Sequence, residues 1–372
     1  MPHYPIDAKL PLVALLVTAL LLIPSLAVPS IDVSVQSIGA SQCEGFWMDV
    51  NVTNLENRPL ENYTFNITIP SDRIPSYSRL KAGNVYVVDE NGNPLYYWVM
   101  RRTGKVFTVF FKVPHIDANG WAVVRIYYGS DNPYRRYRKP AELFVYWEPF
   151  NSLKNYPHVD SGIFSNSRAF GSGELYIKRG KLVVNSTIST NWWSGSTAKE
   201  AELVKLKVDD SYAIVFKFKR GSGNQGVVSY PFYMFIHTRT GGGWFGQDRY
   251  DYIAIKENSN SKFRFEFGND RSGSDETSKY AGKQYYLGEI LVSRDGSWGR
   301  VEKFSSGALV ASHTFETSNR FRNREISIGF GQANADWWGT VNLLAYVDWV
   351  YIVRHADYTA EVIGMGAECG FN

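Results

Sequence analysis

Three short segments place tryptophan among glycine, serine, asparagine and aspartate, a setting typical of loops. They are residues 191–195 (NWWSG), 241–246 (GGGWFG) and 335–339 (ADWWG). Indole faces stack on the C–H faces of sugar rings, and neighbouring amide or carboxylate groups hydrogen-bond to sugar hydroxyls. The pattern therefore favours glycan binding, although the same rings would also serve to cap the ends of a hydrophobic core. The candidate glycan contacts are Trp192, Trp193, Trp244, Asp336, Trp337 and Trp338.

No recognisable catalytic pattern accompanies these aromatic segments. A β-glucan hydrolase of the sandwich type needs carboxylates at alternate positions of one strand, because that spacing puts them on one face. The nearest approach is Glu266 with Asp270, and the alternation of Glu266 with phenylalanines turns it toward solvent. The sequence also lacks H-E-x-x-H, G-x-S-x-G and a phosphate-binding loop. We expect no catalytic residues, and a glycoside hydrolase is the least favoured function.

The N-terminus carries an uncharged apolar run, residues 10–23 (LPLVALLVTALLLI), followed by Pro24-Ser25-Leu26-Ala27. Small residues at 25 and 27 fit the cleavage site of a secretory signal peptide, so we expect residues 1–27 to be removed. Two alternatives stay open. The run is close to the length of a membrane-spanning helix and would act as an anchor if retained. Alternatively, the chain would be cleaved within residues 7–10, ahead of the apolar run, in the manner of a pilin signal sequence. If residues 10–23 are present in the purified protein, an anchor or a filament subunit is favoured over a secreted protein.

Export agrees with two further features of the sequence. Four N-glycosylation acceptor triplets occur, at Asn51, Asn62, Asn66 and Asn185. Cys43 and Cys369 are the only two cysteines. In an oxidising compartment two cysteines most simply form one disulfide, whereas two separate buried thiols are the alternative. We therefore expect an extracellular or cell-surface protein whose only membrane contact would be an uncleaved N-terminal segment.

Composition points to an all-β protein. The 372 residues include 24 Tyr, 22 Phe, 11 Trp, 32 Gly and 15 Pro, which suits strands and turns better than helices. Hydrophobic residues at 44% and charged residues at 20% exclude an intrinsically disordered chain. The net charge of +4 is too balanced for the cationic face of a nucleic-acid-binding protein. The expected partners are glycans or other surface proteins.

Short alternating runs fill the region before residue 141. Expected strands cover residues 32–35, 46–52, 63–69, 85–88, 95–99, 106–113 and 121–128, and Asn91-Gly92 marks a hairpin. About seven short strands indicate a small antiparallel β-sandwich over residues 28–141. The polar stretch 131–140 (DNPYRRYRKP) reads as a solvated boundary. Longer strands with period two follow, as in Tyr212, Ile214, Phe216 and Phe218, and residues 142–372 form a second domain.

Residues 84–130 resemble a family of bacterial and archaeal surface proteins, the domain of unknown function 2341. The family's D-x-x-G-x-x-L-x-y-w hairpin matches Asp89, Gly92, Leu95, Tyr96 and Trp98. Its strand motif and closing Y-Y-G-N match residues 110–120 and Tyr127-Tyr128-Gly129, with Ser130 in place of the last asparagine. This resemblance implies a surface protein but assigns no activity.

The second region resembles a concanavalin A-like or laminin-G-like jelly roll, a partner that such domains often have. The matching segments are Glu148-Pro149-Phe150-Asn151, residues 181–184, residues 298–312 and residues 346–351 (YVDWVY). This resemblance implies a larger β-sandwich, and calcium in some relatives, for which Asp209, Asp210 and Asp348 are the weak candidates. Apart from that, no cofactor or metal is expected.

The sequence thus predicts an exported, non-catalytic surface or adhesion protein, which binds carbohydrate through its second domain. A pilin-like or membrane-anchored subunit of a surface assembly is the alternative, and a glycoside hydrolase the third.

Overall fold

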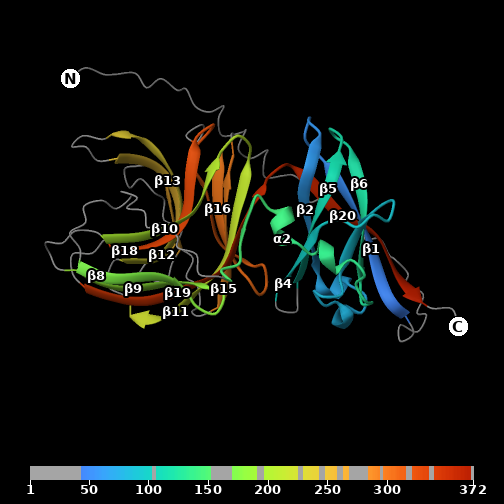
Figure 1. Ribbon diagram of the computed structural model, residues 1–372, viewed down its shortest axis with the longest axis horizontal. Helices are drawn as coiled ribbons and strands as arrows, with labels where there is room; N and C mark the ends of the chain where they lie inside the picture. Colours follow the sequence, from blue (N-terminus) through green and yellow to red (C-terminus); the bar gives the residue numbers. More distant parts are fainter. Residues whose placement is uncertain are drawn as a thin grey trace, which may run out of the picture. The chain divides into compact units, whose positions relative to one another are not determined.

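The chain is almost entirely β-structure, as the sequence predicts (Figure 1). The computed structural model describes residues 43–102, 106–151, 170–190, 197–224, 229–242, 248–257, 263–267, 284–293, 296–315, 321–334 and 339–369. All of its strand pairs are antiparallel, and the strands form four sheets. Two of these sheets face each other in a first sandwich and two in a second, so the all-β prediction is confirmed.

The first sandwich contains a four-stranded sheet, in the order β20-β1-β6-β3, and a three-stranded sheet, β2-β5-β4. Every second side chain of β1 and β6 points inward, for example Met48, Val50 and Ile126, which are fully buried. They pack against Phe65 and Phe111 from the other sheet. The strands are β1 (Cys43–Asn54), β2 (Leu60–Pro70), β3 (Tyr86–Asp89), β4 (Tyr97–Arg102), β5 (Val106–Ile116), β6 (Trp121–Tyr128) and β20 (Tyr358–Cys369).

The predicted turn after β3 is present, but the flanking strands do not form the expected hairpin. β3 pairs with β6 and β4 pairs with β5 in the other sheet, and only an isolated bridge joins Val88 to Pro94. The carboxylate of Asp89 accepts hydrogen bonds from the backbone N–H groups of Asn91 and Asn93, at 2.9 and 2.8 Å. Gly92 has φ +81°, a left-handed conformation that glycine adopts without steric cost. The family motif therefore places an acid and a glycine where this turn requires them.

The last strand was not expected in the first sandwich. β20 pairs with β1 from Tyr358 opposite Asn54 to Cys369 opposite Cys43. The chain completes the second sandwich and then returns to the first. The expected domains, residues 28–141 and 142–372, do not include this return. Alternation alone cannot reveal this, because a strand pattern does not say which sheet the strand joins.

The second sandwich packs an eight-stranded sheet, with path β17-β16-β15-β11-β19-β9-β8 and β7 beside β19, against a five-stranded sheet, β10-β18-β12-β13-β14. The predicted inward positions of β11, Tyr212, Ile214, Phe216 and Phe218, are all buried. The strands are β7 (Tyr146–Glu148), β8 (Phe170–Ile177), β9 (Leu182–Thr190), β10 (Thr197–Lys207), β11 (Tyr212–Asn224), β12 (Ser229–Gly242), β13 (Asp248–Glu257), β14 (Phe263–Phe267), β15 (Tyr285–Val292), β16 (Ser297–Lys303), β17 (Leu309–Phe315), β18 (Glu325–Asn334) and β19 (Gly339–Arg354).

The core of the second sandwich depends on one close backbone approach. Gly288 lies opposite Phe216, and a Cβ atom at position 288 would come within 2.2 Å of the phenylalanine ring. The missing side chain lets the ring lie directly on the backbone of β15, which closes the core without a void.

The segment between the sandwiches is short and partly ordered by buried contacts. It holds the turns η3 (Arg135–Tyr137) and α2 (Pro140–Leu143), while the first sandwich also has η1 (Ser71–Arg73) and η2 (Tyr77–Arg79). Its four cations are exposed, as expected. Asn132, in contrast, is buried and donates hydrogen bonds to the Val85 carbonyl and the Tyr97 hydroxyl. The boundary is therefore anchored to the first sandwich.

In the ranges described above, no helix has the length and apolar character needed to cross a membrane. The apolar segment 10–23, the expected cleavage site and the expected strand at residues 32–35 lie outside the described residues.

The register of β1 and β20 yields a test of the predicted disulfide. Because the backbones of Cys43 and Cys369 lie directly opposite each other, we expect the two thiols to be oxidised in exported protein. Alkylation under denaturing, non-reducing conditions should label neither cysteine, and both after reduction. Loss of the link in Cys43→Ser should lower the free energy of unfolding by up to about 5 kcal/mol, because the closed loop is very long. Full labelling without reductant would show two separate thiols instead.

Candidate functional site: a cleft between the sandwiches

Aromatic rings join the two sandwiches. Trp98 of β4 contacts Trp147 of β7 and Trp349 of β19, with ring centroids 4.9 and 5.6 Å apart. Phe144, next to α2, stacks on Tyr351 of β19 at 4.3 Å and 16°. These rings, together with Phe110 of β5, bury the outer face of the eight-stranded sheet where it meets the three-stranded sheet. We call them the aromatic joint: Trp98, Phe110, Phe144, Trp147, Trp349 and Tyr351.

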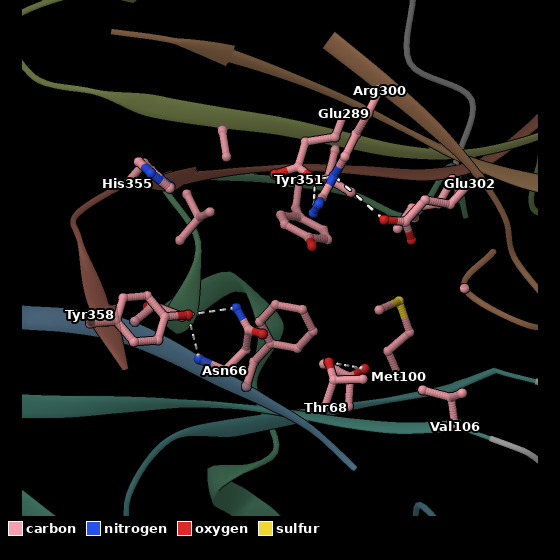
Figure 2. A pocket seen from close by; sticks show the side chains of 18 of the residues that line it. Asn66, Thr68, Met100, Val106, Glu289, Arg300, Glu302, Tyr351, His355 and Tyr358 are labelled. Atoms are coloured by element: carbon pink, nitrogen blue, oxygen red, sulfur yellow. Dashed lines mark hydrogen bonds and ion pairs between the residues drawn. The ribbon is translucent and has the colours of Figure 1, made fainter. Parts of the chain in front are cut away.

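A cavity of about 410 Å³ opens beside the aromatic joint. One wall comes from β2, β4, β5 and β20 of the first sandwich, and the other from β11, β15, β16 and β19 of the second. Figure 2 shows the two walls facing each other, with Asn66 and Thr68 on one side and Glu289, Arg300 and Tyr351 on the other. Volumes of this size are typical of small-ligand sites.

The first wall carries neutral polar groups. The side-chain amide of Asn66 donates to the Tyr358 hydroxyl at 2.8 Å, and the backbone N–H of Asn66 donates to the same oxygen at 3.1 Å (Figure 2). The hydroxyls of Thr68 and Thr108 lie 3.0 Å apart on neighbouring strands. Burial raises the pKa of Tyr358 to about 12, so this phenol is neutral at physiological pH. The wall therefore offers hydroxyls and one amide.

The second wall carries charge. Antiparallel pairing of β15 and β16 puts Arg300 directly opposite Glu289. The guanidinium lies 2.7 Å from the Glu289 carboxylate through Nε and 2.6 Å through its second terminal nitrogen. The same Nε is 3.5 Å from a carboxylate oxygen of Glu302 (Figure 2). Burial raises the pKa of Glu289, and the Arg300 charge opposes that rise.

This arrangement suits recognition of a polyhydroxylated molecule. Carboxylates accept hydrogen bonds from hydroxyl groups, whereas threonine, tyrosine and asparagine both donate and accept. A few polar groups of this kind orient a ligand between apolar surfaces, here Met100 and Tyr351. The Arg300 guanidinium contacts both the Glu289 and the Glu302 carboxylate.

The residues predicted for glycan contact cannot be compared with this cleft, because the structure does not describe them. Trp192, Trp193, Trp244, Asp336, Trp337 and Trp338 all lie outside the described residues, so that hypothesis stays a prediction.

The weak calcium candidates have other partners. Asp209 accepts a hydrogen bond from the Tyr212 hydroxyl at 2.6 Å, which lowers the pKa of Asp209. Asp210 pairs with Arg58 at 3.1 Å. Asp348 receives the ammonium groups of Lys181 and Lys217. The described part of the chain contains no group of three or more His, Cys, Asp or Glu side chains arranged to hold a metal ion.

The acceptor asparagines occupy different environments. Asn62 is exposed at φ +49°, and Asn51 lies half-buried on β1. Asn66 lines the cleft, so a glycan on its amide would fill the cavity. Asn185 lies on β9, and its side chain is outside the description.

Sequence reasoning missed the charged wall. Glu289 is an ionisable residue within the otherwise apolar strand YYLGEILV, and its side chain is only 12% exposed. That anomaly is a usable signal, because a buried acid needs a partner. The partner on the next strand, Arg300, was not predictable without the register.

Comparisons with known proteins support part of the predicted resemblance. The family model for the domain of unknown function (DUF2341) matches residues 81–156, which confirms that resemblance. Four of the six residues of the aromatic joint lie inside this match: Trp98, Phe110, Phe144 and Trp147. No match emerges from the curated proteins.

Similar solved structures include lectins and a carbohydrate-binding module. The seed lectin of Lotus tetragonolobus is 11% identical with a TM-score of 0.35, covering 57% of this chain and 100% of the lectin. Arcelin-5, a lectin-like defence protein of Phaseolus vulgaris, is 13% identical with a TM-score of 0.35, covering 57% and 98%. The CBM2 module of the evolved Dit protein of Lactobacillus casei BL23 phage J-1 is 15% identical with a TM-score of 0.38, covering 57% and 97%.

The buried acid predicts a specific pH dependence. Between the ordinary glutamate pKa of about 4.3 and the raised pKa of Glu289, the folded chain holds a proton that the unfolded chain has released. The contribution of Glu289 to stability therefore falls as pH rises through this window. Glu289→Gln should remove that slope in denaturant titrations at successive pH values.

Arg300→Met tests the other half of the same pair. It should extend the window to higher pH, because the pKa of Glu289 in the folded chain rises further without the opposing charge. It should also lower the free energy of unfolding at pH 7 by about 2 kcal/mol, a moderate loss because Arg300 is 42% exposed. Lys205→Met at an exposed ion pair is the control and should change stability by less than about 0.5 kcal/mol. A Glu289→Gln variant with the wild-type slope would contradict this account.

Proposed function

We propose that this chain is an exported, non-catalytic surface protein that binds carbohydrate, with the cleft between its sandwiches as one binding site. The observation that carries this proposal is the pairing of a hydroxyl- and amide-bearing wall with a carboxylate–guanidinium wall across a cavity of about 410 Å³. Sugar hydroxyls need donors and acceptors on several sides at once, and these two walls supply them from opposite directions. A mono- or disaccharide unit of a longer glycan would fit such a space.

The tryptophan segments of the second sandwich are proposed as a further contact region for the same class of ligand. Their composition supports stacking on sugar rings. The export and surface location of the protein are proposed from the N-terminal apolar run, the acceptor asparagines and the two cysteines.

Hydrolysis is the second candidate, because two glutamates share one wall of the cleft. A glycosidase needs one carboxylate as acid and one as base or nucleophile, on either side of the scissile bond. Here a single guanidinium contacts both Glu289 and Glu302. Catalysis would require Arg300 to leave that position, whereas binding uses the wall as it stands.

A glycan array followed by titration of the best hit tests the proposal. Thr108→Val removes one hydroxyl of the cleft while keeping the shape of the side chain, and Glu302→Gln removes one charge. Each should weaken binding about 10-fold, the effect of losing one buried hydrogen bond. Lys205→Gln, on another sheet, should bind as wild type.

The same glycans also separate the alternatives. Trp193→Ala and Trp338→Ala should weaken binding if the loops contribute. If the wild type binds no glycan on the array, the carbohydrate proposal is wrong. Release of reducing sugar by wild type but not by Glu289→Gln would establish the hydrolase instead.

A further inference from the structure

Three lysine ammonium groups gather around one tyrosine ring on the outer face of the eight-stranded sheet. The Nζ atoms of Lys181, Lys217 and Lys219 lie 5.3, 4.6 and 5.2 Å from the centroid of the Tyr285 ring. Lys217 also lies 4.3 Å from the centroid of Phe304. Aromatic faces attract cations, so the rings help to hold the ammonium groups together.

This cluster has more positive charge than its own acid can balance. Asp348 accepts from Lys181 through one oxygen and from Lys217, at 2.6 Å, through the other. Lys219 has no ion pair within the described part of the chain. The Asp348 carboxylate thus pairs with two of the three ammonium groups around Tyr285, of which Lys217 is only 16% exposed. Converging, half-buried like charges cost free energy unless a further anion lies nearby.

A β-bulge places the single acid in the cluster. Lys217 pairs with Trp349 and Phe218 with Val347, so Asp348 is the extra residue on β19. A bulge changes the direction of a side chain. The sequence analysis considered Asp348 for calcium, and the structure gives it two lysine partners instead.

The cluster lies on two of the strands that line the cleft, β11 and β15. Val215 of β11 and Leu287 of β15 line the cavity. Lys217 and Tyr285 are their next neighbours on the same face, two residues further along each strand, and Lys219 lies opposite Tyr285. Two residues of a strand span about 7 Å, so the backbones of Lys217 and Tyr285 lie about that far from those of the cleft residues Val215 and Leu287.

We propose that Lys181, Lys217 and Lys219 form a subsite for the carboxylate or sulfate group of an acidic glycan, next to a sugar unit bound in the cleft. This proposal rests on the carbohydrate function proposed above and adds the chemical class of the ligand. An anionic substituent would balance the excess charge of the cluster through charge-assisted hydrogen bonds to the ammonium groups. The net charge of only +4 over the chain gives no extended track for a nucleic acid.

A matched pair of oligosaccharides tests this subsite on the secreted full chain. Hexagalacturonate and its fully methyl-esterified form share one backbone and differ only in charge. Dextran sulfate and dextran form a second pair with sulfate groups. We expect the charged member of at least one pair to bind about 10-fold tighter in calorimetric titrations at low salt, with an advantage that shrinks as salt increases.

Lys219→Gln is the discriminating variant, because it removes a charge without breaking an ion pair. It should reduce the preference for the charged member several-fold, with an unchanged melting temperature and unchanged affinity for the uncharged member. Lys205→Gln, which also removes one cation but lies on β10, should keep the full preference. Asp348→Asn adds net positive charge and should increase the preference if the variant remains folded.

The outcomes separate this proposal from the function on which it rests. Equal affinity for both members of each pair, or a Lys219→Gln variant with the wild-type preference, overturns the subsite while carbohydrate binding stands. Weakened binding of the uncharged member in Thr108→Val but not in Lys219→Gln supports two distinct parts of one site. Tighter binding of a thymidine dodecamer than of any acidic glycan, lost in Lys219→Gln, would assign the cluster to nucleic acid and overturn the glycan assignment.

Discussion

The aromatic joint is the constraint on which the candidate site depends. Trp98 alone contacts Phe110, Phe144, Trp147 and Trp349, with ring centroids 4.9–5.7 Å apart. Packed aromatic rings bury large areas and prefer defined angles, so they fix position better than a flexible linker does. The cleft exists because this cluster holds two sheet faces together at one end and leaves polar side chains beside it.

The polar walls are stable because their groups already have partners. Arg300 balances Glu289, Tyr358 accepts from Asn66, and Thr68 lies beside Thr108. These groups therefore have hydrogen-bond partners within the chain, and a ligand would replace those bonds with bonds to itself. The exposed pair of Arg58 and Asp210 adds a second polar connection between the sandwiches, which contributes little because it is solvated.

Local physics made much of the fold predictable, whereas the site depends on tertiary contacts. Period-two alternation identified the buried face of β11, and Asn-Gly located the turn stabilised by Asp89. Alternation could not show that β20 rejoins β1, nor that Arg300 faces Glu289, because both follow from strand pairing across long separations. Trp98 belongs to a motif recognised from sequence, but its role at the joint required the structure.

Calorimetry of the purified chain tests the central claim, that the aromatic joint makes the two sandwiches one cooperative unit. We expect a single transition in the wild type, with equal calorimetric and van't Hoff enthalpies. Trp98→Ala should lower stability by about 3 kcal/mol and split the transition into two. Two independent transitions in the wild type, unchanged by Trp98→Ala, would contradict the account.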